Sequence, residues 1–353
     1  MQKTCIWYAA LAATTLAAFP AAASVTPGDV KTFKDWTVGC DNGLDCQAVA
    51  LMDEQDDTGY LSVVVTRPAG ASATLTIDLP SSGLKPGGYQ IRTDGKLVMD
   101  AVVDSDDQPI KLSGANALKL LRAMARGDQI RLQTFSGTQI GKASLSGASA
   151  AFRYMDAKQG TVGPKYAIVV TSGKPKIGKK PLLPVITARK IVPDNVLPDT
   201  AALVALSESS PCAAERFEST QDTAYSLGND SSGPRALVLL NCGAGAYNFS
   251  SGIYTGRRDA KGKWTFEPAK FDFGATGFTD ESKFPILVNA GWDADTQTIS
   301  SFAKGRGLGD CGSSESYVWD GQMFRLTSAS FMGECRGSND WIPTWRADVR
   351  LVP

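Results

Sequence analysis

The chain has 353 residues, with 36 basic and 36 acidic side chains and no histidine. The charge balance argues against a nucleic-acid binder that relies on net attraction to phosphates. The absence of histidine excludes Ser-His-Asp and Cys-His nucleophilic catalysis, and it excludes His-ligated zinc and haem sites. We therefore expect no cofactor, no metal and no nucleic-acid partner.

The first 23 residues have the features of a signal peptide. Lys3 supplies a positive charge, residues 5–19 are apolar or small, and residues 21–23 (AAA) fit a cleavage site after Ala23. A buried N-terminal helix is the alternative. No later segment reaches the ~20 apolar residues of a membrane-spanning helix. The sequence predicts a soluble protein of the periplasm or the extracellular space, without a transmembrane segment.

Six cysteines remain after the leader, in three groups of two that are close in sequence. Oxidising compartments preserve disulfides, and pairing between sequence neighbours is the least entangled of the possible connectivities. If all six are oxidised, no thiolate is left as a nucleophile or metal ligand. We expect three local disulfides: Cys40–Cys46, Cys212–Cys242 and Cys311–Cys335.

Residues 24–158 are predicted to form a β-rich N-terminal domain. Apolar residues alternate at Trp36, Val38 and Cys40, as in a half-buried strand, and again over residues 46–50, so Cys40 and Cys46 flank a hairpin loop. Further strands are predicted at 60–66, 73–79, 128–135 and 138–145, with a hairpin over 90–103 that turns at residues 93–96 (TDGK).

Two helices interrupt these strands. Ser113 is the predicted N-cap of the first, because the apolar residues after it recur at spacings of three and four and stop before Gly127. Residues 146–158 are predicted as the second helix, with Phe152 and Met155 on one side.

Residues 159–200 differ in composition from both flanks. They contain six prolines and a strong excess of Lys and Arg over acidic residues, which predicts an extended interdomain linker. A contact with an anionic surface is the alternative. A short helix is expected over residues 201–206.

Residues 201–353 are predicted to form a C-terminal, disulfide-stabilised β domain. Short strands recur at nearly regular spacing, which is typical of an antiparallel sandwich or a barrel-like fold. The predicted strands are 222–227, 236–240, 247–255, 264–269, 286–290, 298–303, 316–319, 323–331 and 344–351. The predicted fold class is mainly β, with two antiparallel β domains.

Several C-terminal segments are too particular to be generic. They are 292–301 (WDADTQTISS), 304–312 (KGRGLGDCG), 319–326 (WDGQMFRL) and 341–347 (WIPTWRA). Together with Asp35 and Trp36 ahead of residues 40–42 (CDN), they resemble the bacterial exported family designated domain of unknown function eleven-seventy-six. That family carries no established activity, so the resemblance implies export and organisation but no mechanism.

A second resemblance concerns residues 24–158. Their Asp-Trp-x-Val-x-Cys opening, middle helix and closing small-residue helix are similar to the invasion-associated locus B family, small exported β proteins linked to host-cell entry. This chain lacks most of that family's other cysteines. The resemblance implies a shared fold at most.

The candidate binding residues are Lys304, Arg306, Asp310, Trp292 and Trp319. Four glycines between basic residues at 304–312 can form an anion-binding nest. The alternative is a tight, disulfide-anchored loop in which Arg306 pairs internally with Asp310. Tryptophan rings stack on sugars and anchor protein interfaces, but small β domains also use them as core.

No catalytic residue is assigned. Asp310 with Glu315, Asp320 or Glu334 could supply the two carboxyls of a glycoside hydrolase, whereas Asp293 and Asp295 fit a hairpin turn better than a calcium loop. We expect an exported, non-catalytic binding or envelope-associated protein whose partner is an envelope glycan or another exported protein. The alternatives are a carboxylate-dependent hydrolase of envelope glycan and an inhibitor-like module that acts through residues 304–312.

Limited digestion with trypsin tests the domain division. We expect the first cuts between Lys174 and Lys180, leaving two resistant fragments on a denaturing gel, because an extended basic segment offers the protease exposed backbone. Survival of this segment while one of the predicted domains is cut would contradict the linker.

Overall fold

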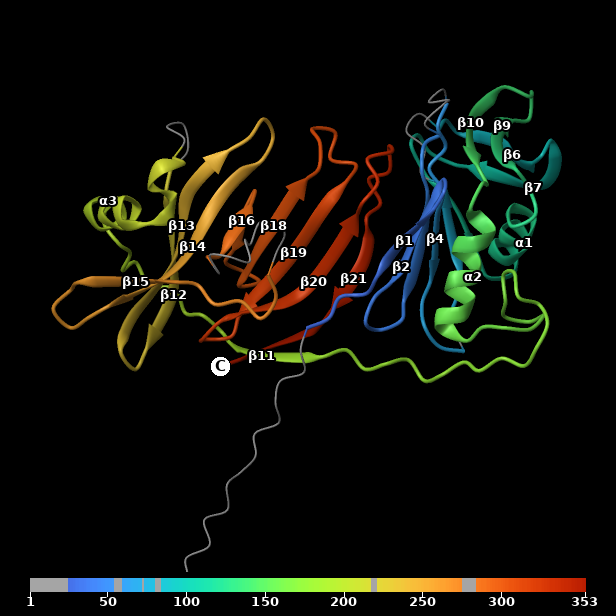
Figure 1. Ribbon diagram of the computed structural model, residues 1–353. Coiled ribbons are helices and arrows are strands. Elements are labelled where there is room, and N and C mark those ends of the chain that lie inside the picture. Colours follow the sequence, from blue (N-terminus) through green and yellow to red (C-terminus); the bar gives the residue numbers. More distant parts are fainter. Residues whose placement is uncertain (1–24, 54–58, 72, 80–83, 217–220, 275–283) are drawn as a thin grey trace, which may run out of the picture.

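The computed structural model describes residues 25–53, 59–71, 73–79, 84–216, 221–274 and 284–353. The predicted signal peptide and its cleavage site after Ala23 lie outside these residues. The described chain is mainly β and forms two halves side by side, the N-terminal half in blue to green and the C-terminal half in yellow to red (Figure 1). The predicted mainly β fold class is confirmed.

The N-terminal half contains two antiparallel sheets. The larger has the order β1 (Val30–Phe33), β2 (Trp36–Cys40), β3 (Cys46–Ala50), β4 (Val64–Arg67), β5 (Thr76–Leu79) and β8 (Ile110–Ser113). The smaller has the order β10 (Gln139–Ser144), β9 (Gln129–Thr134), β6 (Gly87–Thr93) and β7 (Lys96–Val103). The predicted hairpin with its turn between Thr93 and Lys96 is therefore β6 followed by β7.

Two helices complete the N-terminal core, as predicted: α1 (Gly114–Met124) and α2 (Ala148–Gln159). The ring of Trp36 on β2 meets the ring of Phe152 on α2 edge-on at 5.2 Å, and both side chains are fully buried. Trp36 Nε1 donates a hydrogen bond to the Ser144 carbonyl at 2.9 Å, so this large residue is buried with its polar atom satisfied. Ser113 is the N-cap residue of α1, but its side chain makes no cap hydrogen bond.

The C-terminal half contains two sheets of five strands each. One comprises β12 (Thr223–Asp230), β13 (Gly233–Ala244), β14 (Phe249–Arg258) and β15 (Trp264–Pro268), with β16 (Ile286–Val288) also paired to β14. The other comprises β17 (Gly291–Asp293), β18 (Thr298–Lys304), β19 (Gly312–Trp319), β20 (Phe324–Met332) and β21 (Ile342–Arg346). The helix α3 (Thr200–Ser209) and the 3-10 turn η1 (Pro211–Ala214) precede them.

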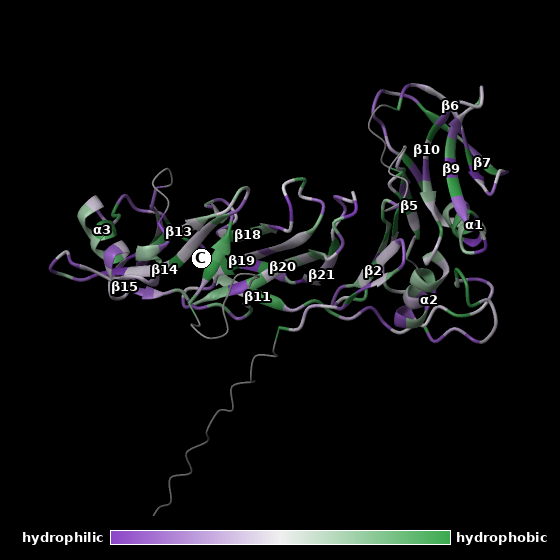
Figure 2. Ribbon diagram, turned by 45° about the horizontal axis from the view of Figure 1, so that its top comes forward, coloured by the Kyte–Doolittle hydropathy of each residue, from purple (hydrophilic) through white to green (hydrophobic). Residues whose placement is uncertain are grey.

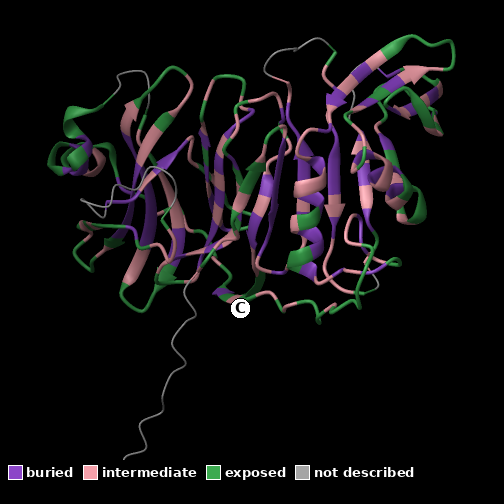
Figure 3. Ribbon diagram, turned by 45° about the vertical axis from the view of Figure 1, so that its right-hand side comes forward, coloured by how far each residue is buried: buried purple, intermediate pink, exposed green. Residues whose placement is uncertain are grey.

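The apolar side chains that hold these sheets together follow the strands. Hydrophobic residues lie along the strands of both halves in Figure 2, and Figure 3 shows buried residues along the same strands. In the C-terminal half, Phe324 is fully buried and its ring lies 5.0 Å from those of Phe271 and Trp319. Among the described residues, no helix has the length and apolar character needed to cross a membrane.

One strand prediction was wrong. Residues 344–351 do not form one strand, because the chain leaves the sheet after β21 and starts β22 (Asp348–Val352). β22 pairs in parallel with β11 (Val185–Arg189), which lies inside the predicted linker. Earlier in that segment Ala167 and Ile168 are buried, whereas residues 171–176 are exposed. The segment is thus packed at both ends, and the domain division at 159–200 stays a prediction.

The three disulfides join the cysteines that were predicted to pair. Cys40–Cys46 closes the hairpin of β2 and β3, Cys212–Cys242 ties η1 to β13, and Cys311–Cys335 ties the start of β19 to the segment after β20. The two bonds that close longer loops each contribute roughly 3–4 kcal/mol in the chain-entropy model.

The two halves meet where β21 lies against β2 and β3 (Figure 1). The Arg346 guanidinium binds both Asp41 and Asp45 of the β2–β3 turn. Asn42 Nδ2 donates to the Arg346 carbonyl at 2.9 Å, and the Arg346 amide donates to Asn42 Oδ1 at 2.8 Å. Ile342 packs into an apolar cluster with residues of the N-terminal half. The contact combines charge, hydrogen bonds and apolar burial.

Arg346→Ala should lower the free energy of unfolding by about 2 kcal/mol, because Asp41 is buried and loses its cationic partner. Burial alone would raise the pKa of Asp45, but the Ala69 amide, Lys180 and Arg346 outweigh it and hold this pKa below 3.8. The Asp45 contribution is therefore present above about pH 4 and lost as pH falls through the lowered pKa.

Urea unfolding at neutral and acidic pH measures both effects. The difference between the native chain and Arg346→Ala should shrink on acidification, and Arg350→Ala, an exposed arginine on β22, should change little. Equal losses in the two variants would contradict the assigned role of Arg346.

Candidate functional site

The predicted binding loop at residues 304–312 connects β18, which ends at Lys304, to β19, which begins at Gly312. Arg306 Nε donates to Asp310 Oδ1 at 2.7 Å, and a second bond joins Arg306 Nη2 to Asp310 Oδ2. The Gly337 amide also donates to Asp310 Oδ2 at 2.7 Å, and the Asp310 side chain is only 3% exposed. The bond from Arg306 holds the pKa of Asp310 below its usual value, against the opposing effect of burial. The structure therefore contains the internal pairing that the sequence left open as an alternative.

Two of the loop glycines stand where a side chain would collide with neighbouring atoms. A Cβ on Gly305 would lie 2.7 Å from Cys311 Sγ, and one on Gly312 would lie 1.9 Å from the Ala303 carbonyl oxygen. The amides of Gly305 and Gly309 donate to carbonyls within the loop, at 2.8 and 3.0 Å. These two amides are thus committed internally and do not serve an anion nest.

The other predicted residues are distributed over different surroundings. Lys304 lines a shallow depression beside the rings of Phe302 and Trp341, which stack with centroids 4.7 Å apart. Trp292 packs against the C-terminal apolar core, with its ring edge-on to Phe324. Trp319 lines a separate pocket. The structure therefore does not gather the five predicted binding residues into one site.

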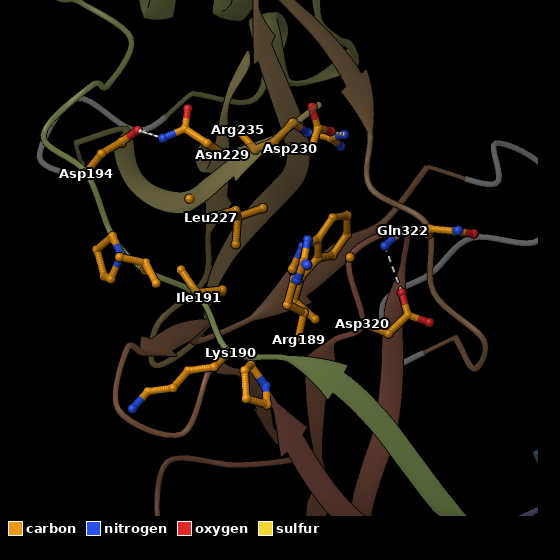
Figure 4. A pocket seen from close by; sticks show the side chains of 16 residues that line it. Arg189, Lys190, Ile191, Asp194, Leu227, Asn229, Asp230, Arg235, Asp320 and Gln322 are labelled. Carbon is orange, nitrogen blue, oxygen red and sulfur yellow. Dashed lines mark hydrogen bonds and ion pairs between the residues drawn. The ribbon is translucent and has the colours of Figure 1, made fainter. Parts of the chain in front are cut away.

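That separate pocket has a volume of about 560 Å³, within the range of small-molecule sites. Three segments that are far apart in sequence build it: the chain after β11, the β12–β13 hairpin and the β19–β20 turn (Figure 4). We call it the Arg189 pocket; it is lined by residues 189–194, 227–230 and 319–322, Arg235 and Pro353.

Four hydrogen bonds hold the segment after β11 in place. The Ile191 amide donates to Gln297 Oε1 at 2.7 Å, and Gln297 Nε2 donates to the Arg189 carbonyl at 2.9 Å. Asp194 accepts hydrogen bonds from Ser226 Oγ at 2.9 Å and from Asn229 Nδ2 at 2.8 Å. These bonds tie the segment after β11 to the β12–β13 hairpin and to the turn between β17 and β18.

The floor of the pocket is apolar, with a buried arginine at one side. Leu227 and Trp319 are buried, and Arg235 Cζ lies 5.7 Å from the centroid of the Trp319 ring. Arg235 Nη1 binds Asp230 Oδ2 at 2.9 Å. Arg235 is 8% exposed, and its buried Nε has no hydrogen-bond partner among the described residues. Within the described residues, one donor of this buried cation is therefore unused.

The acidic side chains of the pocket are engaged. Burial alone would raise the pKa of Asp230, but the Ser232 amide, Arg235 and Arg257 outweigh it and lower this pKa. Asp320 accepts from two backbone amides and from Arg325 Nε at 2.7 Å.

Two basic side chains of the pocket are unpaired. Arg189 and Lys190 are exposed, and within the described part of the chain their side chains have no hydrogen-bond or ion-pair partner. Figure 4 shows Arg189 extending into the middle of the pocket, between Leu227 and Gln322. The free charge of this pocket is therefore positive.

Sequence reasoning missed this site. Arg189 and Lys190 counted only toward the basic composition of the predicted linker. Nothing in the apolar sequence around Arg235 indicated a binding role for it. Of the predicted binding residues, Trp319 lines the pocket, and so does Asp320 from the carboxyls considered for hydrolysis. The adjacent basic residues Arg189 and Lys190 were visible in the sequence. Their position in a pocket could not be predicted, because it depends on the pairing of β11 with β22.

The carboxylates considered for hydrolysis lie in different surroundings. Asp310 is bound to Arg306 and Asp320 to Arg325, while Glu315 is buried and lines another pocket with Ser313 and Thr344. Asp293 Oδ1 accepts the amides of Asp295 and Thr296 at 2.8 and 3.1 Å, which is the hairpin turn predicted there.

These features define a β-rich, disulfide-bonded protein with a mixed apolar and cationic pocket. The chain belongs to the family described as protein of unknown function (DUF1176), whose model matches residues 30–348. The predicted family is thereby confirmed. It is 26% identical to the uncharacterized protein YpfG of Escherichia coli (strain K12) over 347 residues, which cover 89% of this chain and 92% of YpfG.

A solved structure, that of the invasion associated protein B from Bartonella henselae, is also similar. It shares 16% identity and covers 37% of this chain and 97% of that chain, with a TM-score of 0.28. A likeness at this level adds nothing to the argument about function.

Arg306→Ala should lower the melting temperature by several degrees, because Asp310 loses a two-point ion pair in a nearly buried position. The pKa of Asp310 is lowered in the folded chain, so this loss should be present above about pH 4 and should disappear as pH falls through that lowered pKa. Lys304→Ala, which leaves the pair intact, is the control. Unchanged melting of Arg306→Ala in calorimetry would show that the pair does not hold the loop.

Proposed function

We propose that this chain is an exported, non-catalytic binding protein that holds a small organic anion in the Arg189 pocket. The observation that carries the proposal is Arg189 beside the buried Arg235, above an apolar floor. Among the described residues, the Arg189 side chain and Arg235 Nε have no partner. A carboxylate can take two parallel hydrogen bonds from a guanidinium. The apolar body of the same ligand would cover Leu227 and Trp319.

Binding is favoured over catalysis by the state of the acidic groups. A general acid or base requires a proton that is exchanged near the working pH. Asp230 has a lowered pKa and is committed to Arg235, and Asp320 is committed to Arg325. Asp230 thus supports the pocket's Arg235, and Asp320 is occupied by an arginine outside the pocket, so the hydrolase alternative has less support than binding.

Export is supported by the three disulfides, which persist in oxidising compartments. The first 23 residues add the pattern of a cleaved signal peptide. In the periplasm or outside the cell, acidic sugars of envelope glycans are ligands of the required kind, because they join a carboxylate to a ring with an apolar face. An inhibitor-like role for residues 304–312 has less support, since Arg306 is occupied by Asp310.

Titration of the native chain with glucuronate and with uncharged glucose tests the proposal. We expect glucuronate to bind measurably more tightly than glucose by calorimetry. Arg189→Glu should weaken glucuronate binding by about tenfold or more, because it replaces the attracting charge with a repelling one.

Arg350→Glu is the matched control, since Arg350 is an exposed arginine on the neighbouring strand β22 and does not line the pocket. Equal affinity for both sugars, no binding of either, or equal weakening by the two charge reversals would contradict the proposed site.

A further inference from the structure

A second cavity lies in the N-terminal half, away from the Arg189 pocket. It has a volume of about 350 Å³ and lies among the β4–β5 connection, the start of α1, the end of α2 and the chain that follows α2. Its lining includes Arg67, Gln159, Gly114, Ala115 and Lys165. We call it the Arg67 cavity.

Arg67 forms an ion pair with Asp156, whose carboxylate has no lone pair left for another donor. Asp156 is fully buried. Its Oδ1 accepts hydrogen bonds from Arg67 Nη1 at 2.9 Å and from Thr161 Oγ1 at 3.1 Å. Its oxygens also accept the backbone amides of Ile168, Val169 and Val170 at 2.9–3.3 Å. Asp156 therefore fixes one end of the guanidinium and is saturated by five donors.

Three buried polar atoms of Arg67 and Gln159 have no hydrogen-bond partner among the described residues. Arg67 is 5% exposed, and its buried Nε and Nη2 lack hydrogen bonds within the described residues. Gln159 is 7% exposed; its Nε2 donates to the carbonyls of Leu44 and Arg67, while its buried Oε1 accepts nothing there. Buried polar atoms are normally paired, because leaving them unpaired costs stability. Burial lowers the pKa of Arg67, an effect that a nearby anion opposes.

Two further positive features border the same cavity. The N-terminus of the 11-residue helix α1 lies here, with no side-chain cap from Ser113 and no acidic residue in its first turn. Helix N-termini attract anions through free amide groups and the helix dipole. Lys165 is exposed at the rim, with its Nζ 5.1 Å from the centroid of the Tyr166 ring. Because Asp156 balances Arg67, the net charge around the cavity is positive.

We propose that the Arg67 cavity binds a small carboxylic acid that also carries a hydrogen-bond donor, such as a hydroxy acid. The carboxylate would take the free donors of Arg67 and of the α1 N-terminus. The hydroxyl would donate to Gln159 Oε1, which a fully ionised inorganic anion cannot do. The volume of about 350 Å³ restricts the ligand to a small molecule. This site is independent of the Arg189 pocket.

Binding of L-lactate and of its uncharged amide to the native chain tests this site by NMR titration and calorimetry. We expect lactate to bind and lactamide to bind at least about tenfold more weakly, because only lactate carries the charge. Lys165→Glu should weaken lactate binding about tenfold by reversing the rim charge. Lys158→Glu is the matched control, since Lys158 also lies over a tyrosine ring but does not line the cavity.

Ala115→Leu provides a second variant that acts by volume rather than charge. Ala115 is exposed at the start of α1, so the larger side chain can extend over the cavity without disturbing the core, and it should abolish lactate binding. Arg189→Glu should leave lactate binding unchanged, which separates this site from the glucuronate site.

The proposal is overturned if lactate does not bind or if lactamide binds equally well. It is also overturned if Lys158→Glu weakens binding as much as Lys165→Glu, or if Ala115→Leu leaves binding intact.

Discussion

The ion pairs of Arg346 with Asp41 and Asp45 are the contact on which the rest of the architecture depends. Arg346 ends β21, and β22 begins two residues later. β22 in turn fixes β11, whose last residue is Arg189. The contact between the halves therefore also sets where the wall of the Arg189 pocket begins, even though Arg346 does not line that pocket.

Three arginine–aspartate pairs in this protein differ in how much of the guanidinium they use. Arg306 binds Asp310 through both Nε and Nη2, and its role is to hold a loop. Arg67 and Arg235 each bind their aspartate through Nη1 alone. Both line a cavity, and both have a buried Nε without a partner in the part of the chain that the structure describes. The pattern of unused donors separates the arginine that holds a loop from the two that we propose to receive a ligand.

The sequence by itself determined features that depend on neighbours along the chain. The period of apolar residues revealed α1, α2 and most strands, because burial of one face imposes that period locally. The three disulfides were also predictable, because each joins cysteines within one short stretch of chain. Family membership followed from the particular segments at 292–347.

Only the tertiary structure decided which distant groups meet. Trp319 was a candidate for exposure, but packing with Phe324 and Arg235 buries it. The charge of Arg306 was visible, yet its pairing with Asp310 depended on how the loop closes. The Arg189 pocket joins three segments through the parallel pairing of β11 with β22, which no local period encodes. Periodicity reports which side of an element is buried, whereas strand pairing and side-chain partners are set by contacts across the whole chain.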